Sequence, residues 1–135
     1  MEYKVTLPYI GGILTDNNYK IGKSKKTRPM VSMWMSELAE KVRELNIPVS
    51  ENYEISLYGR FWDERHPDLA NLHKVVGDSI KKVLIDDKYF IFRDKGLETG
   101  KLEQELDIYI TPIEENKDKK LVTLEFTEVE DMEDG

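Results

Sequence analysis

Apolar residues recur every three or four positions between residues 69 and 83, and this stripe constrains the fold more than any other feature of the sequence. Its members are Leu69, Leu72, Val76, Ile80 and Val83. The spacing predicts a helix of about four turns with one buried face. Asp68 stands directly before the stripe, where a carboxylate can accept hydrogen bonds from the first backbone N–H groups of a helix. Such a helix needs an apolar surface to pack against.

The flanking segments supply that surface as a sheet. Strand character is found at residues 3–9, 53–62, 88–94 and 102–112, and residues 119–129 are a candidate for one further strand. A second amphipathic helix is predicted over residues 30–46, with Pro29 in its first turn. The order strand–helix–strand–helix–strand–strand predicts one α/β domain of the α+β type, in which two main helices pack on a mixed or mostly antiparallel sheet. Trp34, Phe61 and Trp62 are expected in its core, with a dimer interface as the other place for Trp34.

Composition narrows the classes of function. The chain has 135 residues, no cysteine and only two histidines, so neither a disulfide frame nor a thiolate zinc site is possible. A bound metal would be a hard cation held by oxygen, Mg²⁺ or Mn²⁺ by preference. No apolar run is long enough to cross a bilayer, and a cytoplasmic location is the default expectation. No glycine-rich phosphate loop of nucleotide-binding proteins is present, so no nucleotide cofactor is expected.

The charge of the chain is unevenly distributed. The formal net charge is −7, but residues 113–135 carry nine acids and three lysines, so the rest of the chain is close to neutral. Residues 17–29 contain five basic residues and no acid. The residues of this segment that are candidates for DNA contact are Asn17, Asn18, Lys20, Lys23, Lys25, Lys26 and Arg28. A concentrated basic loop on a neutral body is compatible with phosphate binding, and a solvated loop is the alternative.

Acidic residues gather around the predicted helix of residues 69–83. Asp68, Asn71, Lys74 and Asp78 fall on its polar side, and Asp86-Asp87 follows the helix directly. Clustered carboxylates suit phosphodiester chemistry, because Mg²⁺ uses one or two of them and leaves positions for water and phosphate oxygens. The same residues also have ordinary explanations: a helix cap, a turn before a strand, and an (i, i+4) ion pair between Lys74 and Asp78. His73 is not expected to be catalytic.

This stretch resembles the motif of the RusA-type Holliday-junction resolvases of bacteria and phages. Their signature is Pro-Asp-Leu-Asp-Asn-Leu, a lysine two residues on, Asp-Ala-Leu later in the helix, and an Asp-Asp pair before a strand. The chain reads Pro67-Asp68-Leu69-Ala70-Asn71-Leu72, then Lys74, then Asp78-Ser79-Ile80, then Asp86-Asp87. The resemblance covers roughly residues 3–112, so residues 1–112 are expected to form a RusA-like endonuclease domain and 113–135 a C-terminal extension ending in an acidic tail.

The resemblance implies a homodimeric, Mg²⁺-dependent endonuclease, bacterial or phage-encoded, that nicks two strands of a four-way DNA junction symmetrically during recombination and repair. It implies that Asp68 and Asp87 are catalytic metal ligands, with Asp86 beside them, and that Lys74 is a catalytic lysine. Asn71 and Asp78 would be supporting residues. A two-fold enzyme suits a two-fold junction.

Ala70 departs from the motif, because the family has aspartate at this position and a methyl group cannot bind a metal. Three explanations are open: a substitution made to inactivate the enzyme, a naturally degenerate member, or a site that takes its carboxylates from elsewhere. The resemblance therefore predicts a nuclease that, with Ala70, cleaves junctions poorly or not at all. The alternative functions are a DNA-junction-binding protein without catalysis and an acidic protein–protein module built around the tail.

Overall fold

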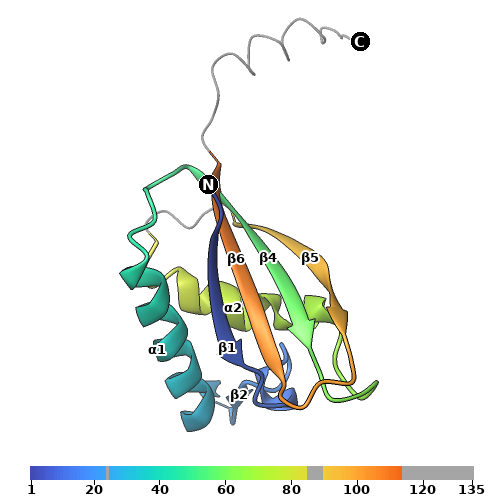
Figure 1. The fold of residues 1–135 in the computed structure, drawn as a ribbon. Helices are drawn as coiled ribbons and strands as arrows, with labels where there is room; N and C mark the ends of the chain where they lie inside the picture. The colour runs from blue at the N-terminus through green and yellow to red at the C-terminus, as the bar shows by residue number, and fades with distance from the viewer. Residues whose placement is uncertain (24, 85–89, 114–135) are drawn as a thin grey trace, which may run out of the picture.

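Four strands form one mixed sheet at the centre of the molecule. They are β1 (Tyr3–Pro8), β4 (Asn52–Arg60), β5 (Phe90–Glu98) and β6 (Glu105–Ile113), in the spatial order β1-β6-β4-β5 (Figure 1). β6 runs antiparallel to both of its neighbours, whereas β4 and β5 are parallel. The parallel pair is possible because a helical crossover joins β4 to β5. The predicted mixed sheet is confirmed.

The computed structural model describes residues 1–23, 25–84 and 90–113. The predicted turn with Asp86 and Asp87 lies outside the described residues, as do the candidate strand over residues 119–129 and the acidic tail.

Two helices cover one face of the sheet. α1 (Pro29–Glu44) runs beside β1, and α2 (His73–Ile80) lies behind the sheet in Figure 1. Ile55 pairs with Ile110 and Leu57 with Ile108 across β4 and β6, and all four side chains are buried. The apolar faces of both helices close this core, as their periodicity predicts: Val31, Trp34, Leu38 and Val42 from α1, and Val75, Val76 and Ile80 from α2.

The apolar stripe over residues 69–83 predicts the start of the second helical segment, but the helix ends earlier, at Ile80, and is of two types. A 3-10 turn, η2 (Leu69–Leu72), comes first, and α2 has only eight residues. Asp68 occupies the N-cap position of η2, yet its side chain makes no capping hydrogen bond, so that expectation is wrong. The turn is closed through the backbone instead, because the Asn71 N–H donates to the Asp68 carbonyl over 2.9 Å.

Phe61 and Trp62, the two aromatic residues that follow β4, were both expected in the core, but they differ in burial. Phe61 is fully buried, whereas Trp62 is 58% exposed, so the prediction is right for the first and wrong for the second. Phe61 turns inward over Gly59, where a Cβ would lie 2.3 Å from the Phe61 ring. Trp62 therefore points outward, where its indole N–H donates to the Leu102 carbonyl over 3.1 Å.

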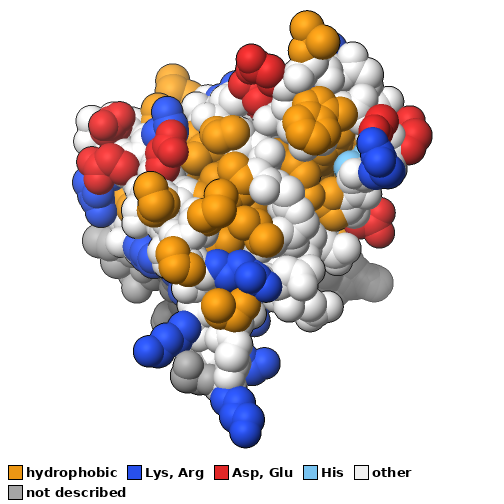
Figure 2. Space-filling model, turned by 90° about the horizontal axis from the view of Figure 1, so that it is seen from below, with side chains coloured by type: hydrophobic (Ala, Val, Ile, Leu, Met, Phe, Trp, Pro, Cys, Tyr) orange, Lys and Arg blue, Asp and Glu red, His pale blue; other side chains and the backbone are white. Residues whose placement is uncertain are grey.

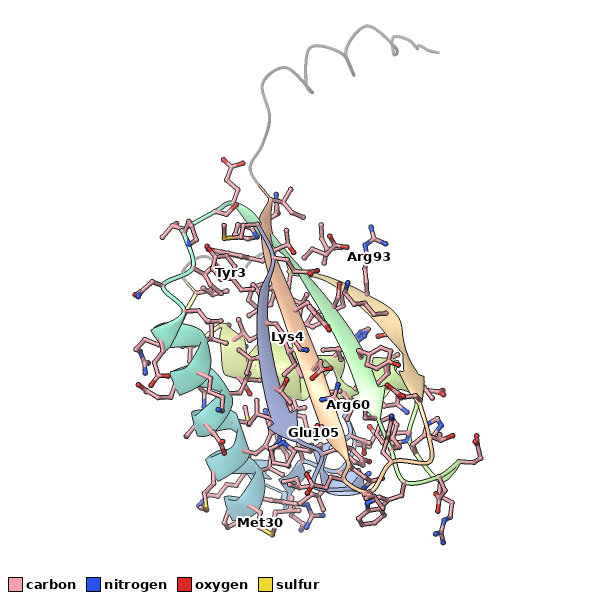
Figure 3. All side chains as sticks on the ribbon, viewed as in Figure 1. Tyr3, Lys4, Met30, Arg60, Arg93 and Glu105 are labelled. Atoms are coloured by element: carbon pink, nitrogen blue, oxygen red, sulfur yellow. The ribbon has the colours of Figure 1, made fainter. Side chains whose placement is uncertain are left out.

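The sheet face away from the helices carries a polar network. The side chains of Lys4, Arg60 and Glu105 lie on this face in Figure 3. Arg60 pairs with Asp107 and Glu105, and Thr6 donates to Asp107 over 2.7 Å. The Asp107 carboxylate is almost fully covered by these partners. Charged partners thus replace water around it, as a buried carboxylate requires.

None of the helices in the described ranges has the length and apolarity needed to cross a bilayer.

Candidate functional site

Ala70 and Lys74 line a hollow beside α2. The hollow has a volume of about 430 Å³, and its floor is formed by Phe90 and Phe92 of β5. Its polar wall residues are Asp16, His73, Lys74, Asp78 and Lys81. The structure therefore brings three residues of the sequence motif, at positions 70, 74 and 78, to one concave surface.

A second hollow of about 370 Å³ lies against the first. Asp16 and Lys74 belong to the walls of both hollows, so the two are continuous at these residues. The other walls of the second hollow are formed by Asn17, Tyr19, Lys20 and Lys25 of the basic segment. We call the two hollows together the cleft. It joins the motif and the basic segment, which lie about 50 residues apart in the sequence.

The basic segment is a small hairpin rather than the expected loop. β2 (Lys20–Ile21) pairs with β3 (Lys26–Thr27), and Gly22 takes a positive φ of 80° in the turn. Positive φ costs glycine nothing because it has no Cβ. Figure 2 shows Lys and Arg side chains crowded on this projecting segment. Hydrophobic side chains cover part of the same face of the molecule in this view.

Two of the expected DNA contacts, Asn18 and Arg28, also hold the base of the hairpin. The Arg28 guanidinium donates to the Asn18 carbonyl over 2.5 Å, and the Arg28 N–H donates to the Tyr19 carbonyl over 2.9 Å. The Asn18 side-chain amide donates to the Thr15 hydroxyl over 2.6 Å. Arg28 and Asn18 thus have structural partners, while Asn17, Lys20, Lys23, Lys25 and Lys26 are exposed side chains of the hairpin and its approach.

Asp78 fixes the hairpin to α2. The buried Tyr19 donates its hydroxyl to the Asp78 carboxylate over 2.5 Å, and Lys81 pairs with the same carboxylate at 3.2 Å. Desolvation raises the pKa of Asp78, but the hydrogen bonds from Tyr19 and Lys81 outweigh it, so the pKa of Asp78 is lowered. Burial and the bond to Asp78 raise the pKa of Tyr19 far above its ordinary value. Asp78 therefore binds the hairpin to the motif helix, and its role as a supporting residue of a catalytic site stays a prediction.

Lys74 is exposed and makes no ion pair with another residue in the described part of the chain. Asp78 pairs with Lys81, so the (i, i+4) pair of Lys74 and Asp78 is absent there. The carbonyl of Asn71 accepts a hydrogen bond of 2.9 Å from the Asp16 N–H, and this contact holds the Asp16 loop against the turn that carries Ala70. Lys74 is left as a cation directed at solvent or at a bound anion.

The proposed metal ligands are not brought together by the described residues. Asp68 is exposed and does not line either hollow, and Asp86 and Asp87 lie outside the described ranges. Over residues 1–23, 25–84 and 90–113, no group of three His, Asp or Glu side chains is placed to hold a metal ion. Asp78 is held by Tyr19 and Lys81. These residues by themselves do not fit a divalent cation, and we derive no catalytic step through one.

Sequence reasoning missed two contributors to the cleft. Asp16 precedes Asn17 and Asn18 directly, but nothing in the sequence pairs it with position 70. For His73 the sequence predicted only that it is not catalytic. It lies beside β5, where its ring stacks on Phe92, and it forms part of the cleft wall.

No protein-family model matches this chain, and no curated protein matches it either. The function is therefore argued from the cleft and from the resemblance of the motif.

Proposed function

We propose that this protein binds the phosphate backbone of branched DNA in the cleft, and that it is a Mg²⁺-dependent endonuclease of four-way junctions whose cleavage is limited by Ala70. The observation that carries the proposal is the shared wall at Lys74, which joins the motif to the basic hairpin. Lys20, Lys25 and Lys74 together present three ammonium groups to one concave surface. DNA affinity depends chiefly on such phosphate contacts and on the counterions that they release.

The overall charge does not oppose this proposal. Most of the net charge of −7 comes from residues 113–135, and the remaining body is close to neutral. The local field at the cleft, not the total charge, determines whether a phosphate is attracted over short distances. The hairpin lysines make no ion pair with other residues in the portion described, so their charge is available to a bound anion.

The proposal includes a divalent cation and a second copy of the chain. Asp68, Asp86 and Asp87 remain the proposed ligands of Mg²⁺, with Mn²⁺ as a substitute. This part of the proposal rests on the resemblance of the motif, because the described residues by themselves do not form a cation site. Lys74 would contact a non-bridging phosphate oxygen. A homodimer would place two clefts on the two equivalent strands of a junction, and such a substrate implies the cytoplasm of a bacterial cell.

Ala70 favours a second candidate function, a junction-binding protein without catalysis. Its methyl group stands in the wall beside Lys74, at the position where the motif has a carboxylate. The cleft can bind phosphate without that carboxylate, but a cation held there would lose a ligand. Binding and cleavage are therefore separable in this protein.

A nicking assay distinguishes the two functions. Ala70→Asp should produce or greatly raise Mg²⁺-dependent nicking of a synthetic four-way junction, with matched linear duplex left intact. Ser36→Asp, which adds the same charge on the exposed side of α1, is the control and should change nothing. Equal cleavage by the original protein and Ala70→Asp would show that position 70 is not a ligand. Absence of junction binding by both proteins would refute the proposed function itself.

A further inference from the structure

His73 and Asp94 form a hydrogen-bonded pair at the edge of the cleft. The Nε2 atom of His73, the first residue of α2, lies 2.7 Å from a carboxylate oxygen of Asp94 on β5. The His73 ring stacks on Phe92 with 4.7 Å between ring centroids and 15° between the planes. The imidazole is therefore held both by its face and by one nitrogen.

Close packing of α2 on β5 sets this geometry. Gly77 faces Phe92 so closely that a Cβ at position 77 would lie 3.1 Å from the Phe92 ring. The helix can therefore approach the strand, and the ring of Phe92 is positioned beneath His73. The same packing places His73 and Lys74 together in the wall of the cleft.

The bonding of His73 determines which ring nitrogen can meet a ligand. An ionised carboxylate only accepts hydrogen bonds, so Nε2 must carry the proton that is donated to Asp94. Nδ1 makes no hydrogen bond with any other residue within the described ranges. In neutral imidazole Nδ1 is an acceptor, but in imidazolium it becomes a second donor.

We propose that His73, held by Asp94, is a proton-linked phosphate ligand of the cleft: its imidazolium form donates Nδ1–H to a phosphate oxygen beside the one that Lys74 contacts. The inference rests on the proposed function, because it assigns the DNA phosphate as the partner of this pair. It adds a contact that neither the sequence motif nor the basic hairpin supplies. DNA binding should then tighten as His73 becomes protonated.

The charges around His73 allow this role. Asp94 faces it from β5, Asp16 comes from the loop before the hairpin, and Lys74, Asp78 and Lys81 come from α2 and its end. Exposed Asp68 precedes η2 outside the cleft wall. Asp78 is already held by Tyr19 and Lys81. Lys74 opposes the imidazolium charge, and a bound phosphate removes that opposition because it lies between the two cations.

Junction binding measured against pH tests the proposal. We would measure affinity of the full chain for a fluorescent four-way junction by anisotropy between pH 5.5 and pH 8, without divalent metal. A charge-assisted hydrogen bond predicts roughly tenfold tighter binding at the acid end. His73→Gln should abolish this difference, and Asp94→Asn should reduce it, because the ring loses the carboxylate that holds it. His66→Gln is the matched control, because His66 stacks on Phe61 and lies outside both hollows.

An NMR titration of the His66 and His73 rings gives a second readout. If His73 had only a structural role, adding junction would not change the pH at which its ring titrates. Adding junction should shift the titration of His73 to higher pH by about one unit, since tenfold preference for the charged form corresponds to that shift, and should leave His66 unchanged. Junction binding with an unmoved His73 would overturn the inference and leave the proposed function standing. If no variant binds junction at any pH, the proposed function fails. A titration of the protein with inorganic phosphate then decides whether His73 belongs to a phosphate site. A shift of His73 alone supports such a site, and the absence of a shift overturns the inference.

Discussion

The hydrogen bond between Tyr19 and Asp78 should stabilise the fold and position the hairpin, and Tyr19→Phe tests both effects. Tyr19 is only 1% exposed, so phenylalanine keeps the buried ring and removes the hydroxyl alone. A hydrogen bond to a charged acceptor contributes about 1.5–3 kcal/mol. The Asp78 side chain is 22% exposed and keeps Lys81, so water and the lysine offset part of the loss. We expect Tyr19→Phe to lower the free energy of unfolding by about 1.5 kcal/mol.

Urea denaturation with a double-mutant cycle measures this contribution. Tyr19→Phe, Asp78→Asn and the double variant should give a coupling energy of about 1 kcal/mol, because the two groups are in direct contact. Tyr58→Phe is the matched control, since its hydroxyl also binds a carboxylate, that of Glu98, but at an open surface. Its loss should be clearly smaller. Additive effects of the single substitutions would refute the assignment of Asp78 as the partner that matters.

The pH dependence of the same variants provides an independent check. The pKa of Asp78 is lowered in the folded protein, although burial alone would raise it, because Tyr19 and Lys81 donate to the carboxylate. A carboxyl with a lowered folded pKa stabilises the protein above its unfolded pKa of about 3.9, and this stabilisation is lost as pH falls through the folded pKa. The original protein and Asp78→Asn should therefore differ at neutral pH and converge once the pH falls below the lowered folded pKa of Asp78. A difference that persists there would exclude the ionised carboxylate as its cause.

Three further predictions concern other parts of the molecule. Changing Lys20, Lys25 and Lys74 together to glutamine should weaken junction binding and flatten its log–log salt dependence by roughly 0.9 per lost contact; an unchanged slope would exclude the cleft as the phosphate site. Gly59→Ala should lower stability by about 1–3 kcal/mol or more in thermal unfolding, because a methyl group at this position meets a buried aromatic ring at 2.3 Å. Asp107→Ala should lower stability by about 2–4 kcal/mol, because Thr6 loses its acceptor and Arg60 keeps only Glu105; wild-type stability of either variant would contradict the packing described.

The helices and strands that the sequence predicted well are those that pack one apolar face, with regular residue spacing, against the core. α1 spans Pro29–Glu44, close to the predicted 30–46, and β4 spans Asn52–Arg60, close to the predicted 53–62. In both cases alternating or helical periodicity follows directly from contact with a single apolar layer. The division of residues 69–80 into η2 and α2 was not predictable, since both helix types place the same residues on the buried side.

The hairpin could not be predicted because its two strands bury almost nothing. Lys20, Ile21 and Lys26 are exposed, and Thr27 is only partly buried. No apolar alternation marks such a strand pair, and apart from Ile21 the sequence offers only glycine and polar residues there. Its order comes instead from long-range contacts at its base, above all from Tyr19, whose partner lies 59 residues further along the chain.

This long-range contact also explains why the motif alone describes only half of the cleft. The motif turn and helix supply Ala70, Lys74 and Asp78, and the opposite wall comes from the hairpin. Asp78 joins the two walls, because it is part of the motif helix and accepts the hydrogen bond of Tyr19. A residue that a motif marks as supporting can therefore determine where the cations of a distant segment stand. On this basis Tyr19→Phe, which changes no charge and lies outside the motif, should weaken phosphate binding.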